Sequence, residues 1–356
     1  MNEMQKHIIP EEATILDALD KINRLSGGAM TLVVAGPEGK ITGTLTDGDI
    51  RRGLLRGTGL ADPVKDLVHR RFMALHASAS ADERLQTMRR AREAGIRLLP
   101  EIDADGRLAG LVDLSTVRSQ LPLTAVLMAG GRGERLRPLT LNTPKPLLEI
   151  GGRAIIDYNI ENLARNGVKD VYVTVKYLAD MMRGYFSRPR HGIMARCIEE
   201  ESPLGTLGAV SLVNFPPQGH TLVMNSDLLT TIDLEEMYLH HISEGAQATI
   251  AAIPYTMSVP YAILTTDGPR VTGIAEKPTA THFANAGIYI FANSLLSRLP
   301  HGERTDAPDF LLDAIGRGDK VAYYPINGTW IDIGSPEEFR HASDLMQHHR
   351  SLTKLG

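Results

Sequence analysis

The residues best suited to phosphate chemistry follow the short apolar run 124–128. Small residues come first, namely Ala129, Gly130, Gly131 and Gly133. Because glycine lacks a side chain, the backbone N–H groups of such a loop can approach a polyphosphate closely. Arg135 and Lys145 follow in the same stretch; arginine can hold a phosphate with two hydrogen bonds, and lysine acts as a point charge. The pattern predicts a phosphate-binding loop.

Two common phosphate motifs do not describe this loop. A Walker loop needs Gly-Lys followed by Ser or Thr, and the dinucleotide fingerprint needs a third glycine after Gly131 and Gly133. A lone Gly-Gly-x-Gly is also typical of a tight strand-to-helix turn with surface arginines. The in-frame segments Pro-Leu-Thr at 138–140 and Pro-Lys-Pro at 144–146 favour the phosphate site instead.

Two aspartates are placed to bind a divalent cation. Asp227 follows the apolar run 221–226, and Asp332 precedes the capping box Ser-Pro-Glu-Glu at 335–338, where a last helix should begin. Open α/β sheets bind ligands at the carboxyl ends of their strands, and Mg²⁺ takes one or two carboxylates plus substrate phosphates. We expect a magnesium site here; a lone aspartate after a strand is otherwise an ordinary turn residue.

The elements that must position these residues alternate between strand and helix. Strand-like runs are 124–128, 171–176 and 221–225, and helical patterns are 155–166, 179–185 and 234–242. Such alternation predicts βαβ units around a sheet. The fold class expected for residues 121–356 is α/β, with a largely parallel sheet.

The front of the chain carries a weak repeat. The turn Gly-Lys-Ile-Thr-Gly at 39–43 is echoed by Gly-Arg-Leu-Ala-Gly at 106–110, and each turn follows a helical pattern and a strand-like run. One such unit needs its twin to bury its apolar face. Residues 1–118 are therefore expected to form a smaller α+β domain, with the junction at 118–122.

Composition excludes several classes of function. The 356 residues are 43% hydrophobic and 22% charged, with a formal net charge of −4 and one cysteine, Cys197. The missing basic excess argues against a nucleic-acid partner, and no apolar run approaches the roughly 20 residues that span a bilayer. One cysteine allows no disulfide within the chain. We expect a cytoplasmic protein with no membrane partner.

With these motifs in frame, residues 123–340 resemble the sugar-1-phosphate nucleotidyltransferases, or nucleotide-sugar pyrophosphorylases. The resemblance implies a Rossmann-like α/β fold with a mixed, mainly parallel sheet. It also implies that a sugar 1-phosphate attacks the α-phosphorus of a nucleoside triphosphate and that pyrophosphate leaves. It implies that the glycine loop holds the nucleotide, that Arg135 and Lys145 stabilise the triphosphate and the transition state, and that Asp227 and Asp332 hold Mg²⁺. Such a reaction needs mainly positioning and charge neutralisation.

The same resemblance assigns a sugar side. Glu276, Lys277 and a proline are similar to the family's sugar-phosphate contact, in which the lysine holds the phosphate and the glutamate a hydroxyl. Asn285 begins a segment similar to the strand that closes the sugar pocket. An exposed charged turn is the alternative at 276–278. Candidate sugars are glucosamine, N-acetylglucosamine and mannose, each as the 1-phosphate, in bacterial surface-sugar biosynthesis.

The base is predicted from Glu200 and Gly205, which stand in a segment that resembles the family's base-reading turn. Gly205 would let the nucleotide lie close. Many family members that use pyrimidine nucleotides have glutamine where this chain has Glu200. A carboxylate only accepts hydrogen bonds, and guanine offers two adjacent donors, so we expect GTP. UTP or dTTP remains the alternative if Glu200 faces solvent.

The front repeat resembles a cystathionine-β-synthase (CBS) domain pair. In that pattern Thr46 would contact a phosphate and Asp49 the ribose of an adenine nucleotide. The second copy has Asp113 and Thr116 in the corresponding places, and an aspartate repels a phosphate. We expect one adenine-nucleotide site at most; a purely structural module is the alternative. Such pairs commonly self-associate, so a homo-oligomer is expected.

Two rival functions remain. A glycosyltransferase of similar fold usually carries an Asp-x-Asp metal motif, whereas Asn225, Ser226 and Asp227 offer a single carboxylate. A non-catalytic nucleotide sensor, built from the same two domains, should first lose residues such as Arg135 and Lys145, and both are present. Pyrophosphate release separates the rivals.

Overall fold

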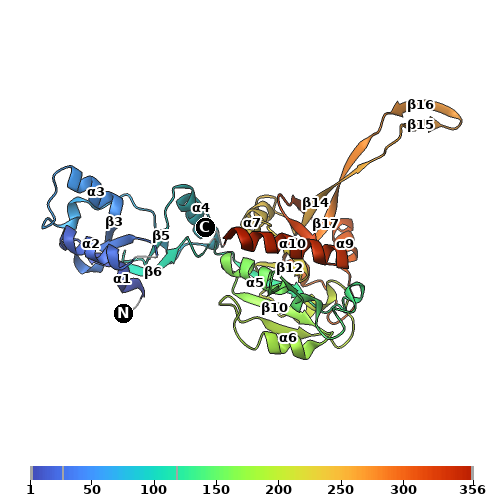
Figure 1. Ribbon diagram of the computed structural model, residues 1–356, viewed down its shortest axis with the longest axis horizontal. Coiled ribbons are helices and arrows are strands. Elements are labelled where there is room, and N and C mark those ends of the chain that lie inside the picture. Colours follow the sequence, from blue (N-terminus) through green and yellow to red (C-terminus); the bar gives the residue numbers. More distant parts are fainter. Residues whose placement is uncertain (1–2, 26–27, 118, 354–356) are drawn as a thin grey trace. The chain divides into compact units, whose positions relative to one another are not determined.

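The structure is a computed structural model that describes residues 3–25, 28–117 and 119–353. The chain forms two compact units (Figure 1). The front unit comprises residues 1–121 with 165–167, and the rear unit residues 122–164 with 168–356. Arg118, at which the predicted front domain ends, lies outside the described residues. The predicted boundary therefore stays a prediction.

The front unit contains two copies of one motif. Its two sheets have the orders β1-β2-β3 and β4-β5-β6, and in each the first pair of strands is parallel and the second antiparallel. The strands are β1 (Ile8–Pro10), β2 (Thr31–Ala35), β3 (Ile41–Thr46), β4 (Leu75–His76), β5 (Leu98–Ile102) and β6 (Leu108–Asp113). The copies meet at their turns, where Lys40 and Arg107 form an antiparallel bridge.

The described helices of the front unit are α1 (Glu3–His7), α2 (Ile15–Arg24), α3 (Asp47–Leu55) and α4 (Ala81–Glu93). Three of these four, α2, α3 and α4, begin at side-chain caps. The Thr14 hydroxyl accepts a hydrogen bond from the Asp17 backbone at 3.1 Å, and the Asp17 carboxylate accepts one from the Thr14 backbone at 3.0 Å. Helix α4 repeats this box with Ser80 and Glu83. Behind each cap, one face of the helix is buried, so each copy has its own small core.

A seven-stranded sheet organises the rear unit, in the order β11-β10-β7-β12-β17-β14-β18. The strands are β7 (Leu123–Met128), β10 (Asp170–Val175), β11 (Arg196–Glu199), β12 (His220–Asn225), β14 (Ala248–Ser258), β17 (Thr279–Ala292) and β18 (Val321–Pro325). Strand β17 is antiparallel to both neighbours, and the other neighbouring pairs are parallel. The predicted α/β class with a mixed, mainly parallel sheet is confirmed.

Helices cover both faces of this sheet. They are α5 (Ile155–Arg165), α6 (Ala179–Tyr185), α7 (Leu234–Ser243), α8 (Asn293–Leu296), α9 (Ala307–Gly316) and α10 (Pro336–Thr353). Successive residues of β12, such as Leu222 and Val223, point to opposite faces, and both are fully buried. Val223 and Phe291 share one face with Phe310 of α9. This burial on both faces explains the continuous apolar runs in the sequence.

The order of the strands creates a crevice at the carboxyl end of β7. Along the chain, β10 and β11 follow β7 on one side of it, and β12 lies on its other side. Open sheets bind ligands at such a switch point. Two short pairs of strands flank it, β8 (Glu149–Ile150) with β9 (Arg153–Ala154), and β13 (Leu228–Thr230) with β19 (Trp330–Asp332).

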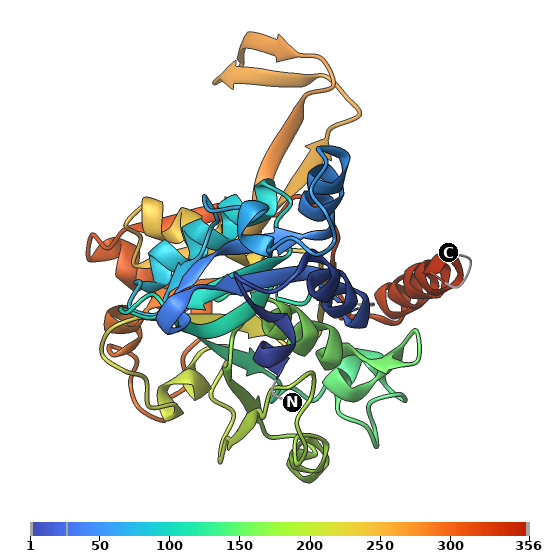
Figure 2. The same cartoon turned by 90° about the vertical axis from the view of Figure 1, so that its left-hand side faces the viewer.

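The outer part of β14 and β17 forms an arm that the sequence did not indicate. The arm comprises residues 253–285 and continues into the hairpin β15 (Ile263–Asp267) and β16 (Arg270–Ala275). It projects from the rest of the rear unit in both views (Figures 1 and 2). Its exposed large apolar side chains are Tyr255, Met257, Tyr261, Ile263, Leu264, Val271, Ile274 and Phe283.

No helix in the part of the chain that the structure describes is long and apolar enough to cross a membrane.

Candidate functional site

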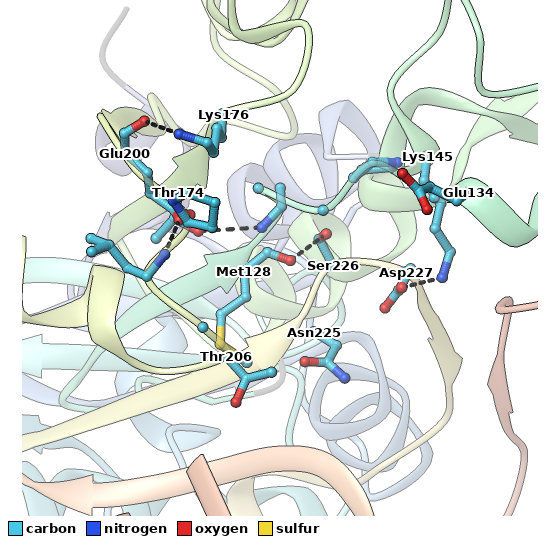
Figure 3. A pocket seen from close by; sticks show the side chains of 18 of the residues that line it. Met128, Glu134, Lys145, Thr174, Lys176, Glu200, Thr206, Asn225, Ser226 and Asp227 are labelled. Atoms are coloured by element: carbon cyan, nitrogen blue, oxygen red, sulfur yellow. Dashed lines mark hydrogen bonds and ion pairs between the residues drawn. The ribbon is translucent and has the colours of Figure 1, made fainter. Parts of the chain in front are cut away.

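A cavity of about 610 Å³ lies at the carboxyl ends of β7 and β12 (Figure 3). Nine of the residues predicted for the rear unit line it: Ala129, Gly130, Gly131, Gly133, Arg135, Lys145, Glu200, Gly205 and Asp227. Segments far apart in the sequence thus meet at one place. The glycine loop, the base-reading turn and one aspartate of the predicted metal pair share a single cavity.

The glycines of the loop have different surroundings. A side chain at Gly130 would collide with the Glu200 carboxylate, and one at Gly131 would meet nothing within 4 Å. Gly133 has a φ of 61°, which favours glycine, and its carbonyl accepts a hydrogen bond from the Thr140 hydroxyl at 2.8 Å. Gly130 therefore makes room for Glu200, while Gly131 leaves the loop open to the cavity.

Lys145 holds together the two predicted metal ligands. Its side chain points at Asp227 (Figure 3), and its Nζ donates a hydrogen bond to Asp227 Oδ2 and lies 3.8 Å from Asp332 Oδ1. The short sheet explains this meeting, because the pairing of β13 with β19 places Leu228 opposite Asp332. In addition, the Ile333 backbone donates to the Asp227 carbonyl at 3.2 Å.

The carboxylate pair fits a divalent cation. Asp227 Oδ1 is buried and accepts no hydrogen bond. Burial and, next, the negative charge of Asp227 raise the pKa of Asp332, while Lys145 and Arg135 lower it. Both observations indicate negative charge that the protein compensates only in part. Among the described residues, no three His, Cys, Asp or Glu gather as a metal group. Mg²⁺ usually takes one or two carboxylates from a protein, together with substrate phosphates.

Arg135 reaches toward the same carboxylates. A side chain at Gly334 would lie 2.9 Å from its guanidinium and 3.4 Å from Asp332 Oδ1. Arg135 and Gly334 both line the cavity. The guanidinium therefore passes over the backbone of Gly334, between the glycine loop and the segment of Asp332.

Glu200 rather than Glu201 faces the cavity. Its side chain is 7% exposed, and its Oε2 accepts a hydrogen bond from the Leu204 backbone at 3.2 Å. Burial raises the pKa of Glu200, opposed by the Leu204 and Thr174 hydrogen bonds and the charge of Lys176. Lys176 Nζ also donates to the carbonyls of Glu200 and Glu201, at 3.2 and 2.8 Å. A buried acceptor thus stands at the wall of the cavity.

The backbone conformation and the packing at Gly205 both require a glycine. Its φ is 76°, and a side chain there would lie 2.7 Å from both Asp306 Oδ1 and the Thr305 carbonyl. Asp306 Oδ1 in turn accepts from the Thr206 backbone at 2.9 Å. The glycine therefore lets the base-reading turn pack against the start of α9. Its predicted nucleotide contact stays a prediction.

The predicted sugar residues do not meet the others. Glu276 and Lys277 are exposed on the arm, between β16 and β17, and neither lines the cavity. Asn285 lies where the arm leaves the sheet, and its Nδ2 donates to the Tyr289 hydroxyl at 2.9 Å. Their assignment to the sugar 1-phosphate remains a prediction.

The structure adds residues that the sequence analysis did not assign to the site. Asn225, Ser226, Thr206 and Lys176 line the cavity, and the Ser226 hydroxyl donates to the Met128 carbonyl at 2.7 Å (Figure 3). The position of Asn225 and Ser226 at the end of a strand was the available signal. Thr206 follows Gly205 of the predicted base-reading turn, and Lys176 directly follows β10.

The front unit has cavities of its own. Thr46 and Asp49 line one of about 670 Å³, together with the basic residues Arg52, His69, Arg71 and Arg97. Thr46 and Asp49 also cap helix α3, since the Thr46 hydroxyl accepts from the Asp49 backbone at 3.3 Å and the Asp49 carboxylate accepts from the Thr46 backbone at 2.9 Å. Asp113 lines another cavity, of about 390 Å³. Residues of both copies line each of these cavities, but Thr46 and Asp49 line one and Asp113 lines the other.

Comparison with known protein families matches both parts of the chain. Residues 124–349 match the family described as "Nucleotidyl transferase". Residues 4–56 match the family described as "CBS domain".

Three curated relatives are named for one activity. The chain is 32% identical over 221 residues to "Putative mannose-1-phosphate guanyltransferase" of Sulfolobus acidocaldarius, covering 61% of either chain. It is 32% identical over 244 residues to "Mannose-1-phosphate guanyltransferase" of Neurospora crassa, covering 66% of either chain. It is 30% identical over 251 residues to "Mannose-1-phosphate guanylyltransferase catalytic subunit beta" of Xenopus tropicalis, covering 66% of this chain and 69% of the relative.

The similarity is therefore partial in length, since the chain spans 61 to 69% of these relatives. The family match, however, extends from the first residues of β7 into α10 and includes every element that lines the main cavity. The chain belongs to the nucleotidyl transferase family.

Proposed function

We propose that the protein is a magnesium-dependent sugar-1-phosphate nucleotidyltransferase. The observation that carries this proposal is the meeting of Arg135, Lys145 and the carboxylates of Asp227 and Asp332 beside a glycine loop. A triphosphate brings several negative charges, which two cations and a magnesium ion would neutralise. The sugar-phosphate oxygen would attack the α-phosphorus, and pyrophosphate would leave with the electron pair of the broken P–O bond.

The chain's own residues have separate tasks in this proposal. The loop around Gly131 would offer backbone N–H groups to the phosphates, without a side chain in the way at this glycine. Arg135 stabilises the charge that develops at the α-phosphate, and Lys145 can move from Asp227 to a phosphate oxygen. Asp227 and Asp332 would hold Mg²⁺, which would supply charge neutralisation at the phosphates.

GTP is the nucleotide that this cavity favours. The Glu200 carboxylate is buried at the wall and can only accept. Its two oxygens have lone pairs beyond those that the Leu204 and Thr174 hydrogen bonds use, and guanine presents two adjacent donors to them. The names of the relatives support GTP with mannose 1-phosphate; glucosamine and N-acetylglucosamine 1-phosphates are the other sugars to test. Use of UTP or dTTP is the alternative within the family.

The experiment measures pyrophosphate release with Mg²⁺ for five nucleoside triphosphates against a panel of sugar 1-phosphates. Release with GTP and mannose 1-phosphate is the expected result, and omission of Mg²⁺ should abolish it. Faster release with UTP or dTTP would reject the role of Glu200 and retain the reaction. Nucleotide binding without release from any pair would support the non-catalytic sensor.

We further propose that the front unit is a regulatory module with one adenine-nucleotide site. The cavity of Thr46 and Asp49 supports this, because four basic side chains line it as well. Burial raises the pKa of Asp49, but hydrogen bonds from Thr46 and the charge of Arg52 bring the pKa below its usual value. A charged Asp49 can accept from ribose hydroxyls. Equilibrium binding of ATP, ADP and AMP, repeated with Thr46→Val, tests the site.

Self-association through the arm is the third part of the proposal. A two-stranded ribbon is marginally stable by itself in water, and this one exposes eight large apolar side chains. Strand β14 pairs with β18 only over residues 248–252 among the described strands, so an edge of the arm is open to another chain. Asp267 and Glu276 balance Arg270 and Lys277, so two copies of the arm do not repel each other.

A further inference from the structure

A buried side chain of helix α5 holds the loop that carries Asp227. Asn159 is 3% exposed, and its Nδ2 donates hydrogen bonds to the carbonyl oxygens of Ser226, at 3.3 Å, and Leu228, at 3.1 Å. These carbonyls belong to the residues directly before and after Asp227. One amide group therefore holds the backbone on both sides of the carboxylate.

The other tethers of this loop lead to different parts of the site. The Asp227 carbonyl accepts from the Ile333 backbone at 3.2 Å, beside Asp332, and the Ser226 hydroxyl donates to the Met128 carbonyl at 2.7 Å, at the end of β7. With Asn159, three consecutive carbonyls of residues 226–228 are hydrogen-bonded. Asn159 itself does not line the cavity, so it acts from outside the site.

A metal-binding carboxylate benefits from such support. Magnesium requires near-ideal octahedral geometry with oxygen distances of about 2.0–2.1 Å. Groups that orient a ligand from behind typically change metal affinity by about 10- to 100-fold when they are removed. Asp227 keeps one buried oxygen without a hydrogen bond, and Lys145 holds the other oxygen, so the orientation of the carboxylate also depends on the backbone that carries it.

We infer that Asn159 is a positioning residue for the magnesium site, acting through the carbonyls of Ser226 and Leu228 on the Asp227 carboxylate. This inference rests on the proposed function, because it assumes that Asp227 holds the cation. Removal of the amide leaves two buried carbonyls without a donor and lets the loop shift. The consequence specific to positioning is weaker metal binding; a merely structural amide would affect only the stability of the fold.

The test compares Asn159→Leu with Ile160→Ala in the full chain. Leucine has nearly the size of asparagine and no donor. Ile160 follows it on α5 and is fully buried, so its truncation lowers stability without removing a hydrogen bond to residues 226–228. Binding of Mn²⁺ in the presence of GTP, without sugar phosphate, is measured from the electron paramagnetic resonance signal of free Mn²⁺, and GTP alone is the blank.

The expected result is about tenfold weaker Mn²⁺ binding for Asn159→Leu and unchanged binding for Ile160→Ala, at similar losses of melting temperature. Asn159→Gln keeps a donor on a longer side chain, so its Mn²⁺ affinity should lie between those of the parent and Asn159→Leu. This variant replaces Asn159→Leu in the comparison if the leucine variant does not fold. In turnover, Asn159→Leu should need more Mg²⁺ for half its maximal rate, and high Mg²⁺ should restore most of that rate.

Equal Mn²⁺ affinity in the parent and Asn159→Leu would overturn the inference, as would equal weakening by Ile160→Ala. If the parent binds no more Mn²⁺ than the GTP blank, both the inference about Asn159 and the proposed metal site are wrong. The reaction is judged separately. If Asn159→Leu weakens Mn²⁺ binding but the parent releases no pyrophosphate from any substrate pair, the proposed function fails and the positioning role stands.

Discussion

The ammonium group of Lys145 donates a hydrogen bond to the carboxylate of Asp227, inside the cavity that the glycine loop borders. Lys145 is 9% exposed, so the pair is poorly solvated. Its Nζ also lies 3.8 Å from Asp332. The ammonium group therefore faces two carboxylates, with the Arg135 guanidinium beside Asp332, and this arrangement determines how the site should respond to a metal ion and to mutation.

Replacement of Lys145 by methionine should make the stability of the protein depend on Mg²⁺. Without the ammonium group, the two carboxylates repel each other in a partly buried place, so the melting temperature falls. Mg²⁺ should restore much of it, because the cation binds the carboxylates that the lysine has left. Pyrophosphate release should fall about 100-fold or more even at high Mg²⁺, since a donor to the transition state is gone. Thermal unfolding with and without Mg²⁺ checks the first effect.

Lys320→Met is the matched control for this variant. Lys320 pairs with Glu244 at 2.9 Å on the surface, with a side chain 56% exposed, so its loss should change neither activity nor the response to Mg²⁺. If Mg²⁺ changes the melting temperatures of Lys145→Met and Lys320→Met equally, Lys145 does not compensate the charge of the carboxylate pair.

Replacement of Glu200 by glutamine should lower kcat/KM for GTP by about 10- to 100-fold and raise it for UTP or dTTP. Glutamine keeps one acceptor and turns the other into a donor, which clashes with the guanine donors. A bidentate contact to a base contributes about 1–3 kcal/mol of discrimination. Steady-state kinetics with each nucleotide measure the change. Glu201→Gln, on the exposed neighbour, should leave the preference for GTP unchanged. If both variants change the preference by the same amount, Glu200 does not select the base.

Local patterns predicted those parts of the site that depend on a single segment. The glycine loop after residues 124–128 could be predicted, because an apolar run followed by glycines marks a buried strand and a turn. Asp227 followed from the same logic at the end of β12. The capping box at Ser335 could also be predicted, although the Glu338 carboxylate accepts from the Gly334 backbone at 3.1 Å, one residue earlier than the standard box.

Contacts between distant segments could not be predicted in this way. The packing of Glu200 against Gly130 depends on the register of three parallel strands, β7, β10 and β11. The arm depends on the pairing of β14 with β17 and on an irregularity between Ile250 and Ala252. A change of register by one residue would turn the side chains of a strand to the opposite face. Local sequence therefore did not reveal that Lys277 lies on the arm.

Acid should destabilise the rear unit through His241. This ring is fully buried, its Nδ1 lies 2.8 Å from the Thr249 hydroxyl and its Nε2 lies 3.0 Å from His220 Nδ1. Burial, and next the charge of His220, lower the pKa of His241 from 6.5 to about 4. Above pH 6.5 the ring is neutral in both folded and unfolded chains, so its contribution to stability is complete. Between pH 6.5 and 4 only the unfolded chain binds the proton, so stability falls.

Urea unfolding at pH 7.5, 6, 5 and 4.5 measures this loss, which should approach about 3 kcal/mol near pH 4 for one group. A His241→Gln variant cannot take up the proton and should show a flatter pH profile than the parent. His341→Gln removes an exposed histidine and should keep the parent slope. Identical slopes for all three chains would assign the acid sensitivity to other groups.

Replacement of Gly334 by alanine should reduce activity more than stability. The new methyl group would lie 2.9 Å from the Arg135 guanidinium, and the end of a flexible side chain can move away at little cost to the fold. Arg135 would then leave the place where it meets the triphosphate. We expect about a 10- to 100-fold loss of kcat with a nearly unchanged melting temperature. Gly316→Ala, where the methyl group meets nothing within 4 Å, should retain full activity.

The arm gives the last prediction, because its exposed residues can be changed without cost to the core. Tyr261 is 75% exposed and Ile274 is 68% exposed, so Tyr261→Asp and Ile274→Asp should leave the melting temperature of a single chain unchanged. In an interface between arms, each aspartate would be buried without a partner, which is strongly unfavourable. Light scattering coupled to gel filtration should show an oligomer for the parent and a monomer for the double variant. Tyr261→Phe keeps the apolar surface and should keep the oligomer. A parent chain that is monomeric at micromolar concentration, or a double variant that stays oligomeric, would place the contact elsewhere or exclude it.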